Sequence, residues 1–301
     1  MAASGPIAKS RRRMLMLLLA PFTLVLGLFF VIPLGIIMVY SFLEPGLYGG
    51  VEWNWYPYNY GRIIGWPLNE YEEFDPIYLK IFLNSVQIAL MTVIGTLVLC
   101  YPAAFWVARM TGTRKNLILF LVTLPFFANM LVRIYAWLLL LRPTGFFNTM
   151  LQSTGVIVEP LDLLFTNFSV IVGMVYILTP FMFLPIYVNV EKLDWSLVRA
   201  SQDLGANPLQ TFRRVILPLT APGIIAGSLI VFIPALGNFI VPSFLGGSKV
   251  QMTGNLIERS FLQSRDWPFG AALALLIMAS VVALILFQLS RQRKSDMRGG
   301  A

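Results

Sequence analysis

The chain of 301 residues is 57% hydrophobic and only 12% charged, and its mean hydropathy is +0.76. This composition excludes an ordinary soluble domain and predicts a membrane protein. The net charge of +8 is therefore interpreted as a signal of membrane topology and not of nucleic-acid binding.

Six apolar runs are long enough to cross a bilayer, which takes about 20 residues each. They lie near residues 14–43, 79–108, 117–141, 166–190, 221–245 and 269–290. The expected fold class is therefore an all-α membrane protein with six transmembrane helices. The first run is too long for a signal-peptide core and no small-residue cleavage site follows it, so we expect it to remain as an anchor.

Charge predicts the orientation of these spans. An N-terminus inside the cell places 15 of the 22 Lys and Arg residues, but only 4 of the 14 acids, on the cytoplasmic side. The positive-inside rule then puts both termini in the cytoplasm, as basic tails over 1–13 and 291–301. Between them we expect a first helix and long external loop (14–78) and a core membrane domain (79–290) with a cytoplasmic loop over 191–222.

The first external loop, Glu44–Tyr78, combines carboxylates with many Trp and Tyr residues. Carboxylates and ring faces could attract an organic cation. Alternatively, the aromatic residues form an interfacial belt and a docking surface for another protein. We favour the second interpretation because aromatic belts are common in membrane proteins.

The third span carries an unusual polar pair. Pro125 is expected to break the span near its middle, and Asn129 and Arg133, four residues apart, share a helix face. Arg133 either faces a cavity or a partner, because a charge in a span is costly, or reaches the headgroups from the outer end of the span. Tyr135 and Trp137 follow at the outer edge.

The polar stretch Glu191–Pro222 contains two short helix signals. Asp194 or Ser196 can cap the first helix, and Gly205 can end it in the left-handed conformation that residues with a Cβ resist. Asn207-Pro208 then starts a second helix, since Asn caps and Pro suits a first helical position.

Leu217-Pro218 and Ala221-Pro222 are expected to stop the second helix before the fifth span. Apolar residues interleave with polar and charged residues along both helices. A bent, amphipathic helix pair between two spans predicts a surface that binds a partner molecule.

The fifth span opens with Gly223 and Gly227, a spacing typical of close helix packing. Two prolines and a glycine then interrupt the helix over 234–242, around Asn238. Irregular backbone at membrane depth is tolerated only inside protein or along a water-filled cavity. Asn238 is therefore a candidate for the lining of a pore.

Absent residues narrow the function. No histidine and a single cysteine, Cys100, exclude a His/Cys metal site, a histidine-based catalytic triad and an intrachain disulfide, so we predict no catalytic residue, cofactor or metal. No acid lies in a predicted span, which counts against proton coupling. No glycine precedes a lysine, which excludes a phosphate-binding loop. Energy is therefore expected from a separate subunit.

The stretch Glu191–Pro222 resembles the coupling loop of ABC-importer permeases, which reads E-A-A, three residues, G, nine residues, I-x-L-P. The positions that match at this spacing are Ala200, Gly205, Leu217 and Pro218. Val215 replaces Ile and Ser201 replaces the second Ala. Arg199 stands where the family usually has Glu, which reverses the charge.

Further stretches are similar to permeases of the spermidine/putrescine type: LVRIYAW, YILTPFMFLPIY, DLGANPLQTFRRVILPLTAPGIIAGSL, FIPALGNFIVPSFLGG and RDWPFGAA. This resemblance implies a type I ABC-importer permease fold in a bacterial inner membrane. It implies an ABC ATPase subunit dimer, a second related permease subunit and a periplasmic or extracellular solute-binding protein as partners. The implied substrate is a small polyamine that crosses the lipid bilayer.

Two sets of candidate site residues follow. The ATPase-coupling set is Val198, Arg199, Ala200, Ser201, Asp203, Leu204, Gly205, Leu209, Phe212 and Arg213. The translocation-path set is Asn129, Arg133, Tyr135, Trp137, Asn238 and Phe239. Such permeases often have an acid where this chain has Asn238.

Two alternatives stay open at this point. An ABC importer of the same class could carry an opine, an amino-acid-like solute or ferric iron. An ion-coupled secondary transporter would need no ATPase, and sodium could be coordinated by backbone carbonyl groups.

Overall fold

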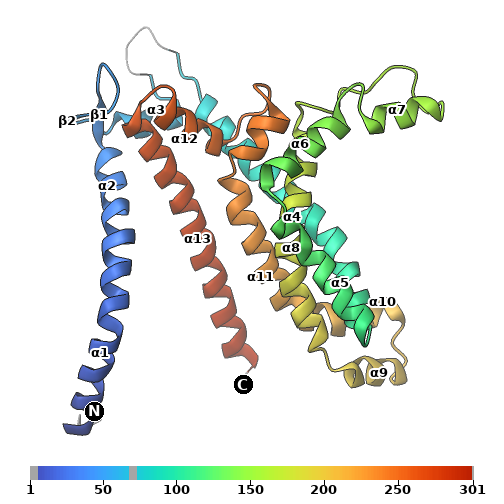
Figure 1. The fold of residues 1–301 in the computed structure, drawn as a ribbon. Helices are drawn as coiled ribbons and strands as arrows, with labels where there is room; N and C mark the ends of the chain where they lie inside the picture. Colours follow the sequence, from blue (N-terminus) through green and yellow to red (C-terminus); the bar gives the residue numbers. More distant parts are fainter. Residues whose placement is uncertain (1–5, 68–72, 300–301) are drawn as a thin grey trace. The chain divides into compact units, whose positions relative to one another are not determined.

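The computed structural model describes residues 6–67 and 73–299, and these form two compact units (Figure 1). One unit combines both ends of the chain, and the other comprises residues 77–256. Six helical segments of the described residues are long and apolar enough to cross a membrane: Leu17–Tyr40, Ile77–Ala108, Met130–Ser153, Asn167–Glu191, Pro208–Leu236 and Trp267–Arg291. The predicted helical membrane fold with six spans is confirmed.

Two long helical segments dominate the unit that contains the chain ends. Their elements are α1 (Pro6–Leu26), the π-helical turn η1 (Gly27–Val31), α2 (Ile32–Tyr40) and α13 (Trp267–Gly299). α13 packs against α2. Helical backbone thus extends into both segments that were expected as basic tails, of which residues 1–5 and 300–301 lie outside the described residues.

The first external loop is folded. β1 (Leu43–Pro45) and β2 (Val51–Trp55) form an antiparallel hairpin, and α3 (Tyr58–Ile64) follows. The buried Asn59 amide donates hydrogen bonds to the backbone oxygens of Ser41, at 3.0 Å, and of the first strand. These bonds fasten α3 to the hairpin.

A salt bridge of 2.9 Å between Arg62 on α3 and Asp266 connects the folded loop to the start of α13. The acidic part of the loop includes Glu70 and Glu72, which lie outside the described residues. The salt bridge thus attaches the folded part of the loop, through α3, to the residue before α13.

The unit of residues 77–256 has three central helices that each pack against the other two: α4 (Ile77–Ala108), α8 (Asn167–Glu191) and α11 (Leu217–Leu236). Gly223 and Gly227 let α11 approach α8 closely. A Cβ at Gly223 would lie 2.8 Å from the Cβ of Asn189, and a Cβ at Gly227 would lie 2.8 Å from the Sδ of Met182. The packing role predicted for these glycines is confirmed.

The third predicted span is divided into several elements, α5 (Thr113–Thr123), the 3₁₀ turn η2 (Leu124–Phe127), α6 (Met130–Leu141) and α7 (Phe146–Ser153). Pro125 lies in η2, which confirms the expected break. The expected bounds of 117–141 were wrong, because this break separates α5 from the apolar segment Met130–Ser153. Asn129 is not inside a helix but caps α6, and its Oδ1 accepts a hydrogen bond from the Leu131 amide at 2.8 Å.

The polar stretch after α8 forms α9 (Trp195–Asp203), α10 (Pro208–Thr211) and the π-helical turn η3 (Phe212–Ile216). η3 continues directly into α11. In Figure 1, α9 and α10 lie at one end of the three central helices and α7 lies at the other end.

The expectation that Pro218 and Pro222 stop the second helix was wrong, since both lie within α11. Pro218 lies in the first turn of α11, where a missing N–H costs little. The Leu217 amide bonds back to the oxygen of Phe212, five residues earlier, so the π turn keeps the backbone satisfied.

The fifth span is interrupted where the sequence predicts it. α11 ends before the non-helical residues Asn238 and Phe239, and the π-helical turn η4 (Pro242–Gly246) and α12 (Thr253–Leu262) follow. The predicted break around Asn238 is confirmed. Pro234, which was expected to contribute to the break, lies inside α11 instead.

Candidate functional site

Local hydrogen bonds define both ends of α9. The Asp194 Oδ1 accepts a hydrogen bond from the Ser196 amide at 2.9 Å, which confirms the predicted cap. The hydrogen bonds from Ser196 lower the pKa of the Asp194 carboxyl below its ordinary value, because they favour the charged form. Gly205 follows α9 with a φ of +83°, so the predicted left-handed end is confirmed.

α10 begins with a reciprocal cap. The Asn207 Oδ1 accepts a hydrogen bond from the Gln210 amide at 2.8 Å, and the Gln210 Oε1 accepts one from the Asn207 amide at 3.2 Å. Pro208 occupies the first helical position. Because these bonds join close neighbours in the sequence, the turn between α9 and α10 is fixed locally.

A hydrophobic cluster attaches α9 to the rest of its unit. Its members are Leu193, Val198 and Ile216, with Phe105, Trp195 and Phe212 packed against them. Val198 is only 8% exposed. The Ser201 and Thr211 hydroxyls, 2.8 Å apart, connect α9 to α10. α4 and η3 supply the other side of this cluster, so α9 is packed against both elements.

The tip of the loop presents apolar side chains on a basic surface. Leu204 is 88% exposed and Leu209 is 65% exposed, and both flank Gly205 in sequence. A cavity of about 540 Å³ is lined by Leu209 together with Arg213 and Arg214. We call Leu204, Gly205, Leu209, Arg213 and Arg214 the coupling face. Burying a leucine side chain is worth about 1.5–3 kcal/mol, so this face favours a protein partner.

The other members of the predicted coupling set occupy different positions. Arg199, Ala200 and Asp203 are exposed on α9. Val198 and Phe212 instead belong to the packing that holds α9 in place. The set therefore contains both residues that a partner could touch and residues that position them.

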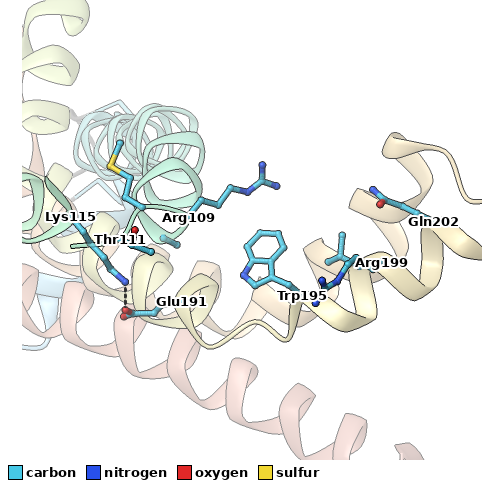
Figure 2. Close-up of a pocket in the computed structure, with 10 residues that line it drawn as sticks. Arg109, Thr111, Lys115, Glu191, Trp195, Arg199 and Gln202 are labelled. Atoms are coloured by element: carbon cyan, nitrogen blue, oxygen red, sulfur yellow. Dashed lines mark hydrogen bonds and ion pairs between the residues drawn. The ribbon is translucent and has the colours of Figure 1, made fainter. Parts of the chain in front are cut away.

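A second hollow lies beside α9, which we call the arginine pocket. It has a volume of about 780 Å³, and its lining includes Arg109, Lys115, Glu191, Trp195 and Arg199. Figure 2 shows that Arg109 extends from the end of α4 toward Trp195, and its guanidinium carbon lies 4.8 Å from that ring centroid. The Lys115 Nζ lies 2.5 Å from Glu191 Oε1, a bond that raises the pKa of Lys115.

No sequence pattern predicted this pocket. Arg109 and Lys115 belong to the basic residues that were interpreted as topology signals, and Trp195 was assigned no role. The pocket forms because α4, α5, α8 and α9 end or begin at one place, which no short motif encodes.

The predicted translocation residues of α6 face different neighbours. The Tyr135 ring contacts Phe244 of η4, with centroids 5.5 Å apart. Trp137 instead contacts Phe147 of α7 and Tyr176 of α8. α6 thus packs between the interrupted segment of the fifth span on one side and α7 and α8 on the other.

Arg133 is half-buried, and its Nε is buried without a hydrogen-bond partner among the described residues. Asn129, one turn earlier, is exposed. Buried polar atoms are normally paired, so the Arg133 Nε is an exception to the usual pattern.

The interrupted segment of the fifth span is held by both local and distant contacts. The Asn238 Oδ1 accepts a hydrogen bond from the Val241 amide at 3.0 Å, which caps the helix that resumes there. Phe239 is exposed, and its backbone oxygen accepts a hydrogen bond from the Asn255 amide group at 3.0 Å. A Cβ at Gly254 would lie 2.5 Å from the Asn238 oxygen.

Gly254 and Asn255 were absent from the predicted site. Asn255 is 8% exposed and also donates a hydrogen bond to Ser243 Oγ at 2.7 Å. Together these two residues of α12 fix the backbone that carries Asn238 and Phe239. Among the described residues, no group of three His, Cys, Asp or Glu side chains could hold a metal ion.

Residues 101–296 match the family described as binding-protein-dependent transport system inner membrane component. The chain belongs to this family. The spermidine/putrescine transport system permease protein PotB of Escherichia coli (strain K12) is 46% identical over 219 residues, which are 72% of this chain and 80% of PotB. The predicted family is therefore confirmed.

Two solved structures share the fold of this family member. A bacterial ABC transporter involved in the import of the acidic polysaccharide alginate has a TM-score of 0.69, at 15% identity, over 95% of this chain and 96% of that chain. A bacterial alginate ABC transporter in complex with an alginate pentasaccharide-bound periplasmic protein has a TM-score of 0.68, at 16% identity, over 94% and 96%. The predicted ABC-importer permease fold is confirmed.

Family membership and the six apolar helices of the described residues make the chain a multi-pass inner-membrane component of a transport system. Within this family member, the coupling face and the interrupted fifth span are the two candidate functional regions. They lie at different ends of α11.

Proposed function

We propose that the chain is the permease subunit of an ATP-driven importer, that it forms the translocation path for a polyamine, and that an ATPase subunit drives it through the coupling face. The main support is the exposure of Leu204, the C-cap of α9, and of Leu209 in α10, because packing and caps fix both helices. The relative named as a spermidine/putrescine permease supports the substrate class.

In this proposal both termini and the coupling face lie in the cytoplasm, where the positive-inside rule puts them. A dimer of ATPase subunits closes on ATP and moves α9. The cluster around Val198 passes this movement to α4 and, through η3, to α11. Packed helices switch between discrete arrangements and do not deform smoothly, so the spans move as rigid bodies.

A second related permease subunit and a periplasmic solute-binding protein complete the proposed importer. The complex of one solved structural relative with a periplasmic protein supports the second partner. The unpaired Nε of Arg133 supports a further group at the α6 side of the path. Asn129, Arg133, Tyr135, Trp137, Asn238 and Phe239 remain the proposed lining.

The test is uptake by purified components in liposomes. The permease, its ATPase, the second permease and the binding protein are expected to accumulate radiolabelled spermidine or putrescine only with ATP inside. Accumulation by the permease chain alone under a sodium or proton gradient would instead establish a secondary transporter. Binding of an opine, an amino-acid-like solute or ferric iron, but no polyamine, to the cognate binding protein would reject the substrate class alone.

A further inference from the structure

The arginine pocket carries unbalanced positive charge on the side of α9 that its packing leaves open. Its lining contains three cationic side chains, Arg109, Lys115 and Arg199, and one carboxylate, Glu191. Lys115 and Glu191 form an ion pair with each other. Two guanidinium groups are therefore left over.

Neither guanidinium has an ion-pair partner in the described part of the chain. The ring faces of Trp195 and Phe105 hold Arg109, at 4.8 and 5.5 Å from their centroids. Ring faces orient a guanidinium but leave its N–H groups without acceptors. Asp194 attracts Arg199, but its Oδ1 accepts the capping bond from the Ser196 amide.

We propose that the arginine pocket receives an Asp or Glu side chain of the ATPase subunit, whose carboxylate pairs with Arg109 and Arg199. This inference rests on the proposed function, because it specifies the chemistry of the partner that docks at the same loop. It adds a polar, charge-dependent contact to the apolar contact of the coupling face.

Continuity along α9 identifies the occupant. α9 supplies Trp195 and Arg199 to the pocket, and its C-cap residue is Leu204 of the coupling face. A partner that covers Leu204 therefore reaches the pocket within the length of one short helix. Guanidinium groups pair with carboxylates through two parallel N–H bonds, which favours a planar carboxylate in this position.

The pocket has a mechanical consequence. Arg109 follows the last residue of α4, whereas Arg199 lies on α9. A carboxylate bound by both would tie these elements together at the moment of docking. The ATPase would then contact α9 both at the arginine pocket and at the coupling face. Movement of the ATPase would be transmitted to α9 more directly than through a contact at one end of the helix.

Charge reversal tests this inference. Arg199→Glu and Arg109→Gln are compared with wild type and with Arg114→Gln, an exposed arginine of α5 outside the pocket. The Kd of the purified ATPase subunit is measured on the reconstituted permease complex at several salt concentrations. We expect Arg199→Glu to weaken binding by about tenfold and to reduce its salt dependence, with Arg114→Gln unchanged.

The partner residue is then found by rescue. Each surface Asp or Glu of the ATPase subunit is replaced in turn by Arg, and one replacement is expected to restore binding to the Arg199→Glu permease while weakening binding to wild type. Arg109→Lys, which keeps the charge, is expected to bind better than Arg109→Gln. Failure of every replacement to restore binding would overturn the inference.

Two further outcomes separate this inference from the proposed function. Wild-type binding by both arginine variants, with binding lost in Leu204→Ser, would overturn the pocket but leave the coupling face intact. Unchanged binding in all of these variants would reject the coupling face as well. An effect of Arg109→Gln in vesicles with cardiolipin, but not in pure phosphatidylcholine vesicles, would assign the pocket to a lipid headgroup and overturn the inference.

Discussion

Two helix interruptions lie on either side of α11 in the chain, and they differ in the contacts that fix their geometry. The turn between α9 and α10 is fixed by neighbours in sequence, through the caps of Asp194 and Asn207 and the left-handed Gly205. The break at Asn238 also depends on Gly254 and Asn255, which lie well beyond it in the chain. The geometry of the first interruption is therefore set locally, whereas that of the second also depends on contacts with α12.

This difference predicts distinct failures. A change in the α9–α10 turn should affect the transmission of energy from the ATPase. A change at the contacts of α12 should affect the path itself and leave docking of the ATPase intact. The variants below test this separation.

The largest effect is expected for Gly205→Val. Apart from its chain neighbours, no heavy atom of the described structure lies within 4 Å of a Cβ at this position, so the penalty comes from the φ of +83° and not from a clash. The left-handed conformation costs about 1–2 kcal/mol for a residue with a Cβ. We expect ATP hydrolysis to continue while uptake falls by about tenfold.

Gly155→Val is the matched control for this prediction. Gly155 has a φ of +71° and equally open surroundings, but it lies in the loop after α7. Its uptake is expected to match wild type. Equal losses in both variants would mean that the strain acts on folding and not on coupling.

Gly254→Ala is the next strongest change. A Cβ there would lie 2.5 Å from the backbone oxygen of Asn238, and overpacking of this kind costs about 1–3 kcal/mol. Uptake should fall several-fold at unchanged Kd for the ATPase. An added Cβ at Gly35 would have no described heavy atom within 4 Å outside its own stretch of helix, so Gly35→Ala should behave as wild type. Weakened ATPase docking in Gly254→Ala would contradict the separation of the two regions.

Asn238→Leu removes the cap on the helix that resumes after the break, a bond worth about 1 kcal/mol. We expect a few-fold lower uptake and normal assembly, measured by uptake kinetics and co-purification. Asn238→Asp keeps the capping oxygen and should therefore be less impaired. Identical kinetics in Asn238→Leu and wild type would remove Asn238 from the path.

The smallest effect concerns pH. The pKa of Asp194 is lowered in the folded chain, so its capping contribution is present above the unfolded pKa and is lost as the pH falls through the folded pKa. Asp194→Asn caps without a charge. The melting temperature of wild type, relative to Asp194→Asn, should therefore decline in acid. A difference that stays constant with pH would show that the Asp194 carboxylate does not contribute.

The sequence predicts the caps, Gly205 and the break at Asn238 because each signal consists of adjacent residues. It does not predict Asn255, since the bond to Phe239 joins positions 16 residues apart. The proline rule failed at Pro218 because η3 shifts the hydrogen-bond register by one residue. The arginine pocket was missed because Arg109 and Trp195 meet only after four helices have packed.

The proposed function requires that the coupling face binds an ATPase. The direct measurement is the Kd of the purified ATPase subunit for the permease complex that carries Leu204→Ser together with Leu209→Ser, compared with wild type. These side chains are 88% and 65% exposed, so the double variant should fold normally. We predict at least about a tenfold loss of binding with folding intact. Wild-type affinity in the double variant would show that the coupling face does not bind the ATPase.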